Sequence, residues 1–131
     1  MSRFSYDFLQ EAGDVLVAAG KLNTVNGADG DDILISAGKT NLLFGGLGND
    51  LVIGAGKNNV ASGDEGDDLL LTAGKSNLMS GGIGDDTLVA AGQSYTLFGG
   101  AGIDFVIGLG KANKAFGQAG EDIVIGLGEG N

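Results

Sequence analysis

The sequence predicts an all-β solenoid in which the chain winds through about seven coils of 18 residues each. Three observations predict this fold class. A short apolar run follows a glycine-rich turn in coil after coil, a second glycine turn divides each coil, and an aspartate recurs every 18 residues without a slip, at Asp14, Asp32, Asp50, Asp68, Asp86, Asp104 and Asp122. A fixed period of this kind is typical of repeat architectures, in which each coil packs only on its neighbours.

The composition limits the classes of function. The 131 residues include 27 glycines but no proline, which argues against collagen and against simple disorder. The formal net charge of −10 disfavours nucleic acid and anionic membranes as partners and favours cations. Cysteine and histidine are both absent, so metal binding is left to oxygen ligands. No run has the length of a membrane span, and the N-terminus lacks the apolar core of a signal peptide, so we expect neither membrane insertion nor a classical secretory route.

We expect a single domain over residues 1–131, with a degenerate first coil at 1–26 and regular coils at 27–131. Before Asp14 the glycine turn is missing, and Phe4, Tyr6 and Phe8 alternate as in a strand. Atypical terminal repeats often cap a solenoid. The alternative is that this aromatic strand completes the last coil of another molecule, in a register that aligns Phe8 with Phe44.

The apolar runs predict the core. Strand side chains alternate, so the middle residue of each run points away from its two neighbours. We expect these middle residues to face the interior: Leu16, Leu34, Val52, Leu70, Leu88, Val106 and Val124. The opposite half of each coil supplies Val25, Leu43, Ala61, Met79, Leu97 and Ala115 at the matching position. Two flat parallel sheets with a narrow core between them are predicted, each run being a minimal strand.

The second turn of each coil carries two polar columns. Asparagines stack at Asn23, Asn41, Asn59, Asn77, Asn113 and Asn131, interrupted by Tyr95, and predict a ladder of side-chain hydrogen bonds. Lysines stack beside them at Lys21, Lys39, Lys57, Lys75 and Lys111, interrupted by Gln93 and ended by Glu129. Like charges about 4.8 Å apart repel. The lysine column is therefore either a solvated edge with splayed side chains or a surface with another role.

The first turn reads Gly-x-x-Gly-x-Asp in six coils. Its first, fourth and sixth positions hardly vary, as we expect where the backbone takes positive φ and carbonyls converge. Aspartates stacked at strand spacing repel one another strongly, so the column requires a cation unless the carboxylates serve only to hydrogen-bond tight turns. Ca²⁺ takes about six to eight oxygen ligands in flexible geometry, which carbonyls and one carboxylate per turn supply, whereas Mg²⁺ fits poorly.

Residues 45–53 and 81–89 match the nonapeptide Gly-Gly-x-Gly-x-Asp-x-U-x, where U is apolar. On these motifs the stretch 27–131 resembles the RTX, or haemolysin-type, calcium-binding repeats. The resemblance implies a right-handed parallel β-roll, with two nonapeptides per coil and calcium between the turns of successive coils. It implies as ligands the carboxylates of Asp32, Asp50, Asp68, Asp86, Asp104 and Asp122, together with carbonyls of Gly27, Gly30, Gly45, Gly48, Gly63, Gly66, Gly81, Gly84, Gly99, Gly102, Gly117 and Gly120.

Six such turns leave five gaps, and Asp14 would complete a sixth, so we expect about five or six Ca²⁺ ions along one edge. The second edge departs from the family pattern by carrying lysine and asparagine, and we expect it to be free of metal. Ala28, Asp64 and Gln118 replace the second glycine of their turns, and Ile103 stands where asparagine or aspartate is common. We expect weaker sites there.

We expect no catalysis, because no nucleophile is paired with a base. An outer apolar face is expected instead, formed by Val15, Val17, Ile33, Ile35, Leu51, Ile53, Leu69, Leu71, Val89, Phe105, Ile107, Ile123 and Ile125. Because such a surface usually marks an interface, we expect a calcium-dependent structural protein that self-assembles, by its ends and this face, into filaments of an extracellular matrix, biofilm or surface fibre. The alternative is a calcium-dependent folding and spacer module of a larger secreted RTX-like protein. Both fit an extracellular protein exported by a type I route.

Overall fold

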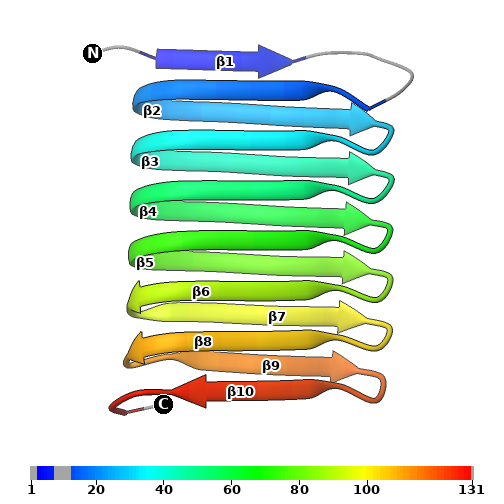
Figure 1. Cartoon of the computed structure of the whole chain (residues 1–131), viewed down its shortest axis with the longest axis vertical. Coiled ribbons are helices and arrows are strands. Elements are labelled where there is room, and N and C mark those ends of the chain that lie inside the picture. The colour runs from blue at the N-terminus through cyan, green and yellow to red at the C-terminus, as the bar shows by residue number, and fades with distance from the viewer. Residues whose placement is uncertain (1–2, 8–12, 131) are drawn as a thin grey trace.

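The computed structural model describes residues 3–7 and 13–130. These residues form a parallel β-solenoid of about six turns with about 18 residues per turn (Figure 1). Within this part of the chain no helix is long and apolar enough to cross a membrane. The strands are β1 (Arg3–Asp7), β2 (Val15–Asp29), β3 (Ile33–Leu47), β4 (Leu51–Glu65), β5 (Leu69–Ile83), β6 (Thr87–Gln93), β7 (Tyr95–Ala101), β8 (Phe105–Lys111), β9 (Lys114–Ala119) and β10 (Ile123–Leu127).

From β2 onwards, strands pair in parallel with partners one coil away. Val15 pairs with Ile33, and Phe105 with Ile123, an offset of 18 residues in each case. The 18-residue period of the sequence therefore sets the register of the whole sheet. Because every coil places the same residue type at the same angular position, identical side chains stack in columns along the axis.

The strands β2 to β5 are longer than the sequence predicted. Each spans 15 residues and passes through the second bend, so the prediction of minimal strands separated by a turn was wrong. All coils bend at the same place, and pairing with the next coil continues around the corner, as at Gly38 with Gly56 and Asn41 with Asn59. Only the later coils break there, at Ser94 and Ala112, whose φ angles are 54° and 53°.

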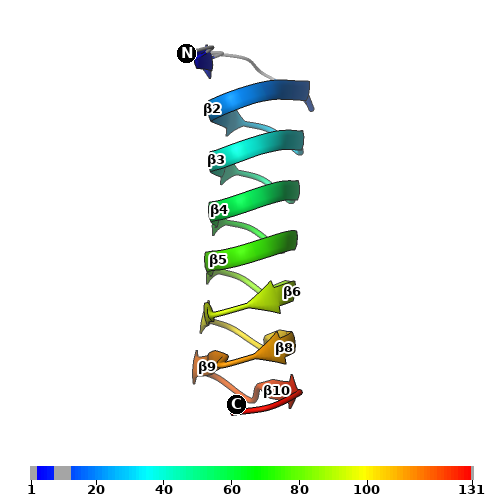
Figure 2. The same cartoon turned by 90° about the vertical axis from the view of Figure 1, so that its left-hand side faces the viewer.

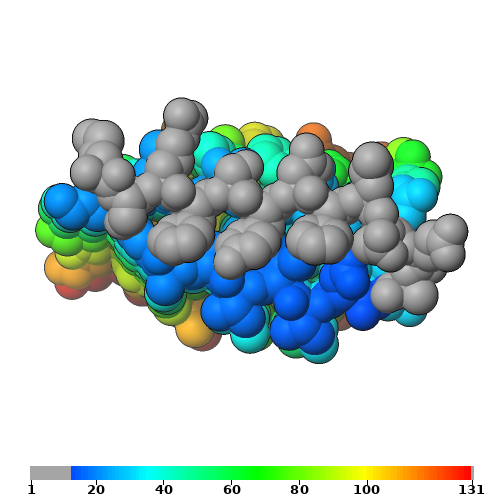
Figure 3. Space-filling model, turned by 90° about the horizontal axis from the view of Figure 1, so that it is seen from above, coloured from blue at the N-terminus to red at the C-terminus, as the bar shows by residue number. Residues whose placement is uncertain are grey.

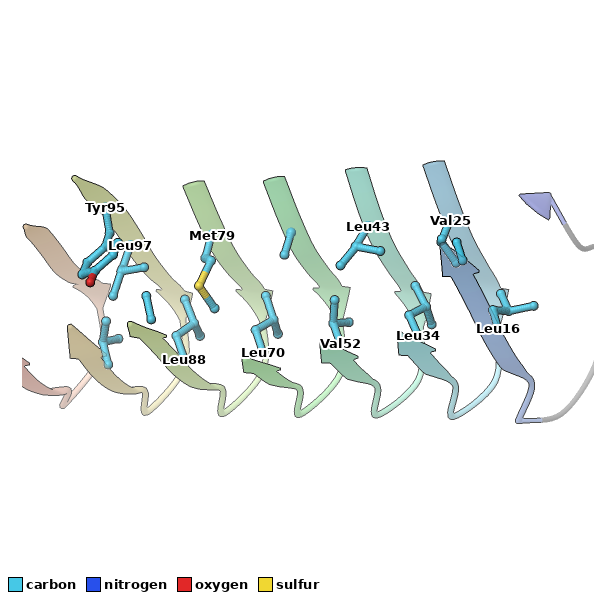
Figure 4. Packing of buried hydrophobic residues seen from close by; sticks show 14 residues of the cluster. Leu16, Val25, Leu34, Leu43, Val52, Leu70, Met79, Leu88, Tyr95 and Leu97 are labelled. Carbon is cyan, nitrogen blue, oxygen red and sulfur yellow. The ribbon is translucent and has the colours of Figure 1, made fainter. Parts of the chain in front are cut away.

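The two walls of the solenoid face each other (Figure 2), and the core consists of side chains that both walls point into the space between them (Figure 4). The predicted inward columns are buried, including Leu34, Val52 and Leu70 on one wall and Leu43 on the other. Two residues near the C-terminal end depart from this: Ala115 is half-buried, and Val124 is 43% exposed, because it lies in the last coil and no further coil of the described residues covers it.

Each coil contributes polar as well as apolar residues to the interior. In the coil of β4 the buried positions are Asp50, Val52, Gly54, Asn59, Ala61 and Gly63. The cross-section is elongated when seen along the axis (Figure 3). Carboxylates therefore close one narrow edge of the interior and carboxamides close the other.

Strand β1 pairs with β2 of its own molecule. The register joins Arg3 to Leu22 and Asp7 to Asn26, an offset of 19 residues, so the strand departs by one residue from the repeat. This arrangement is the cap expected from an atypical first repeat. Phe8, whose alignment with Phe44 was predicted, lies outside the described residues.

Candidate metal centre

The predicted metal-binding aspartates line the edge where each coil passes to the next, on the right in Figure 1. Each comes directly before a strand and points inward: Asp32, Asp50, Asp68, Asp86 and Asp104 are buried, and Asp122 is half-buried. Each backbone N–H donates to the Oδ1 of the aspartate one coil further on. The distances are 2.6 Å from Asp14 to Asp32, 2.8 Å from Asp32 to Asp50 and 2.7 Å from Asp50 to Asp68. The pattern continues to Asp122, and we call it the inner ladder.

The second carboxylate oxygen of the inner ladder is left without a hydrogen-bond partner. This holds for the buried Oδ2 atoms of Asp14, Asp32, Asp50, Asp68, Asp86 and Asp104. A buried carboxylate oxygen with no partner is costly, and its lone pairs are available to a ligand. The orphaned atoms recur once per coil, at the spacing of the predicted sites.

The first glycine of each turn makes room for this carboxylate. A Cβ atom placed on Gly45 would lie 2.2 Å from Oδ2 of Asp50 and 2.7 Å from the carbonyl oxygen of Gly63. Gly27, Gly63, Gly81 and Gly99 show the same pair of close approaches. One carboxylate oxygen and one carbonyl oxygen of the next coil therefore flank the same small space in each gap.

This role differs from the one expected for the first glycine. Positive φ occurs at the second and fourth positions, such as Gly46 at 116° and Gly48 at 119°, and not at Gly45. The expectation of positive φ was wrong for the first position and right for the fourth. The first position needs glycine because an added Cβ would occupy the space beside the carboxylate.

Burial makes the ionised form of these carboxylates unfavourable. It raises the pKa of Asp50 to about 7, and the pKa values of Asp68 and Asp86 to about 6. The pKa of Asp104 is raised for the same reason. Neighbouring carboxylates raise these pKa values further, while the N–H donated by the preceding coil lowers them. A cation in the gaps would reverse both unfavourable effects.

A second ladder, which we call the outer ladder, was not anticipated. The N–H of Asn49 donates to Oδ1 of Asp31 at 2.7 Å, and the N–H of Asp67 donates to Oδ1 of Asn49 at 2.8 Å. The pattern continues from Asp85 to Asp67 and from Ile103 to Asp85. These bonds point toward the preceding coil, opposite to the inner ladder. The signal in the sequence was the Asp or Asn at this position in four consecutive coils.

The fourth glycine of each turn lies beside the outer ladder. A Cβ on Gly48 would meet the carbonyl oxygen of Gly30 at 2.3 Å and Oδ1 of Asp31 at 2.9 Å. The same stacking recurs at Gly66, Gly84 and Gly102. The structure thus places the aspartates of the inner ladder beside the first glycines. The fourth glycines lie instead against the preceding coil and the outer ladder.

Three of the acidic turns carry backbone strain at their second position. Ala28, Asp64 and Gln118 have φ angles of 79°, 82° and 82°, where the other coils have glycine. A side chain in this left-handed region costs about 1 kcal/mol. These are the turns where we predicted weaker sites, and that remains a prediction.

The donor set fits Ca²⁺. Within the described residues no three acidic side chains converge on one point, so a cation would need backbone carbonyls as well as carboxylates. Hard oxygen donors of both kinds are what Ca²⁺ prefers. Bound there, it would neutralise the inner ladder and cross-link successive coils through the orphaned Oδ2 atoms.

The opposite edge satisfies its own polar groups. Nδ2 of Asn23 donates to Oδ1 of Asn41 at 2.8 Å, and the same bond joins Asn41 to Asn59 and Asn59 to Asn77 at 2.7 Å. Each of these three donors also reaches a backbone carbonyl, such as that of Ala55 from Asn41. The predicted asparagine ladder is confirmed for these four residues. The absence of metal from this edge stays a prediction.

The model of the RTX calcium-binding nonapeptide repeat matches the chain in four copies, over residues 11–43, 44–74, 62–97 and 98–131. No curated protein and no solved structure matches the chain significantly. The family match covers the coils whose turns carry the orphaned carboxylates. The chain therefore belongs to the RTX calcium-binding nonapeptide repeat family and forms a calcium-binding β-roll module.

Proposed function

We propose that the chain is a calcium-triggered structural protein that self-associates outside the cell, as a component of a matrix, biofilm or surface fibre. The observation that carries the proposal is the outer apolar face, which runs along one wall of the roll. Val15 and Val17 are 66% and 56% exposed, and Ile123 is 55% exposed at the other end of the roll. Between them Ile33, Leu69 and Phe105 are exposed, and the remaining members of the face are half-buried by their neighbours.

A second copy of this chain fits the face better than an unrelated protein. The face is a stack of mainly aliphatic side chains that repeats once per coil, with Phe105 as its aromatic member and Thr87 as its one polar position, so two copies match one another along their length. A continuous exposed apolar patch of this kind usually marks an interaction surface. The end-to-end contact expected from the sequence also stays a prediction.

Calcium supplies the trigger. Without a cation the inner ladder holds buried carboxylates whose ionisation is unfavourable, and the glycine-rich turns lose much backbone entropy on ordering. Because the calcium sites exist only in the folded chain, the free energy of calcium binding then contributes to the stability of the fold. RTX repeats occur in secreted proteins, which supports an extracellular place of action, where modules bind Ca²⁺ at about 10⁻⁴ to 10⁻³ M.

A second candidate is a folding and spacer module of a larger secreted RTX-like protein. It is favoured by the family match, which assigns nearly the whole chain to repeats. This family is structural and calcium-binding and not typically enzymatic, so neither candidate involves catalysis.

Sedimentation velocity in millimolar Ca²⁺ separates the two candidates. We expect the intact chain to form concentration-dependent polymers, and Leu51→Lys with Leu69→Lys to disrupt them. The matched control is Ser62→Lys with Ser80→Lys, which places the same charges on the opposite wall. A chain that is folded but monomeric at high concentration in Ca²⁺ would favour the spacer module.

A further inference from the structure

Two charged columns face solvent on opposite edges of the roll. The lysine column comprises Lys21, Lys39, Lys57, Lys75 and Lys111, all exposed, on the left edge in Figure 1. The outer acidic column comprises the fifth residues of the turns on the right edge: Asp31, Asn49, Asp67, Asp85, Ile103 and Glu121, also all exposed. Both columns repeat once per coil, so they share one spacing.

Only the last lysine of the column has a counter-charge within the described part of the chain. Nζ of Lys111 pairs with Oε2 of Glu129 at 2.9 Å, and Glu129 stands at the lysine position one coil further on. Lys21, Lys39, Lys57 and Lys75 make no ion pair within the described part of the chain. Stacked like charges repel. A carboxylate presented at the coil spacing relieves this repulsion, as Glu129 does at the end of the column.

The outer acidic column presents carboxylates that are already oriented. Oδ1 of Asp67 accepts the N–H of Asp85, and Oδ1 of Asp85 accepts the N–H of Ile103, each within 2.8 Å. The second oxygen of each carboxylate stays available on an exposed side chain. An oriented carboxylate loses less conformational entropy when it pairs with a lysine.

The two columns match in one register. An acidic-column residue follows each lysine-column residue by 10 positions. When parallel molecules lie side by side in the register that brings these residues together, the pairs are Lys21 with Asp31, Lys39 with Asn49, Lys57 with Asp67, Lys75 with Asp85, Gln93 with Ile103 and Lys111 with Glu121. Four of these are opposite charges, and the uncharged interruptions of the two columns, Gln93 and Ile103, face each other. A shift of one coil in either direction leaves only two opposite-charge pairs, Lys39–Asp67 with Lys57–Asp85, or Lys39–Asp31 with Lys75–Asp67.

We propose that the lysine column of one molecule docks on the outer acidic column of a second copy, with the two rolls parallel and in this register. The inference rests on the proposed self-association and specifies an edge-to-edge contact in addition to the apolar face. Such a head-to-tail contact does not close, so it produces a ribbon of rolls. The outer carboxylates are not among the expected calcium ligands, so they keep their charge when calcium neutralises the inner ladder. Exposed ion pairs are weak singly and are screened by salt, so the contact depends on the whole column.

Zero-length carbodiimide cross-linking tests the register directly. A mixture of ¹⁵N-labelled and unlabelled chain is cross-linked in Ca²⁺ and analysed by mass spectrometry. We expect mixed-isotope links between Lys57 and Asp67 and between Lys75 and Asp85. Links displaced by one coil, or no intermolecular links from the lysine column, would overturn the proposal.

Charge-neutral variants test the contribution to association. Lys57→Gln with Lys75→Gln copies the residue found at Gln93, and Asp67→Asn with Asp85→Asn copies Asn49, which keeps the Oδ1 acceptor of the ladder. In Ca²⁺ at low salt we expect each double variant to raise the concentration for half-association about tenfold. Lys114→Gln is the control, because Lys114 lies outside the column, and it should change nothing.

The outcomes separate this inference from the proposed function. An intact chain that stays monomeric in Ca²⁺ at low salt contradicts self-association itself. Assembly that is indifferent to salt and to both double variants contradicts only the edge contact. Binding of dextran sulfate that requires Lys57 and Lys75, without cross-links between copies, would assign the lysine column to a polyanion and overturn the proposal.

Discussion

Asn77 on β5 lies directly opposite Tyr95 on β7, and the asparagine ladder stops between them. Nδ2 of Asn77 is buried without a hydrogen-bond partner, because the Tyr95 hydroxyl donates instead to the carbonyl of Leu109. The corner changes conformation in the same coil, where Gly92 has a φ angle of 137° and Ser94 turns through the left-handed region, and the change persists in the next coil, where Gly110 has a φ angle of 131°. The replacement of asparagine by Tyr95 in this column therefore coincides with the coil in which the continuous strands β2 to β5 give way to strands that are split at the corner.

The ladder predicts unequal costs for two chemically identical truncations. The side chain of Asn59 donates to Asn77 and to the carbonyl of Ala73 and accepts from Asn41, whereas the side chain of Asn77 only accepts one bond, from Asn59. At about 1 kcal/mol per hydrogen bond, we expect Asn59→Ala to lower the free energy of unfolding by about 3 kcal/mol and Asn77→Ala by about 1 kcal/mol. Urea unfolding in saturating Ca²⁺ measures both. Equal costs would show that the ladder does not stabilise the corner.

Removing one charge from the inner ladder should remove calcium from the gaps beside it. Asp68→Asn keeps the Oδ1 atom that accepts the N–H of Asp50 and deletes the charge. We expect it to weaken two adjacent sites, which equilibrium dialysis with ⁴⁵Ca²⁺ reports as a lower stoichiometry. Asn77→Ala on the opposite edge should leave the stoichiometry unchanged. If both variants lost calcium equally, the metal edge would be wrongly assigned.

Substitutions at the neighbouring residues Gly27 and Ala28 should change the free energy of unfolding in opposite directions. In Gly27→Ala the new Cβ would lie 2.3 Å from Oδ2 of Asp32 and 2.5 Å from the carbonyl oxygen of Gly45, so we expect destabilisation of about 1–3 kcal/mol. Ala28→Gly relieves a φ of 79°, for which we expect stabilisation of about 1 kcal/mol. Chemical unfolding of the calcium-loaded chain measures both. A destabilised Ala28→Gly would show that the left-handed turn is not strained.

The raised pKa values predict how the metal-free fold depends on pH. A carboxyl group with a raised folded-state pKa binds protons more tightly in the folded than in the unfolded chain. Its contribution to stability is therefore complete below the unfolded value of 3.8 and is lost as pH rises through about 6 for Asp68 and Asp86 and about 7 for Asp50. We expect circular dichroism in chelator to show more β-structure at pH 4 than at pH 8. A metal-free fold that is more stable at pH 8 would contradict this assignment.

Removal of calcium at neutral pH should unfold most of the chain. The buried carboxylates then ionise without a counter-charge, and each coil depends on its neighbours for a core. We expect excess chelator to abolish the β-sheet circular dichroism signal and millimolar Ca²⁺ to restore it. Mg²⁺ at the same concentration is the control and should restore little. Persistence of the β-sheet signal in chelator would refute calcium-dependent folding.

The sequence predicted what depends on period and alternation. The 18-residue spacing fixed the partners of Leu34 and Val52, and strand alternation identified both as interior residues. What it missed depends on conformation within a turn. Gly45 and Gly46 are indistinguishable in the sequence, yet Gly45 leaves space for a carboxylate and Gly46 adopts a positive φ. The outer ladder was missed because Asp31 and Asp32 are adjacent and chemically identical, and only backbone geometry sends their hydrogen bonds in opposite directions along the axis.

The interior is filled by facing side chains from the two walls and repeats with the coil, so the molecule has a fixed cross-section but no fixed length. Duplicating or deleting 18 residues between β3 and β5 would preserve every column, both carboxylate ladders and the pairing of the edges. Each such step would change the length by about 4.8 Å and the number of calcium gaps by one. A single-residue insertion within a strand, by contrast, would reverse the alternation of the side chains in the rest of that strand and break its 18-residue register with the neighbouring coil. The chain can therefore gain or lose whole coils, whereas the insertion or deletion of part of a coil would interrupt its columns.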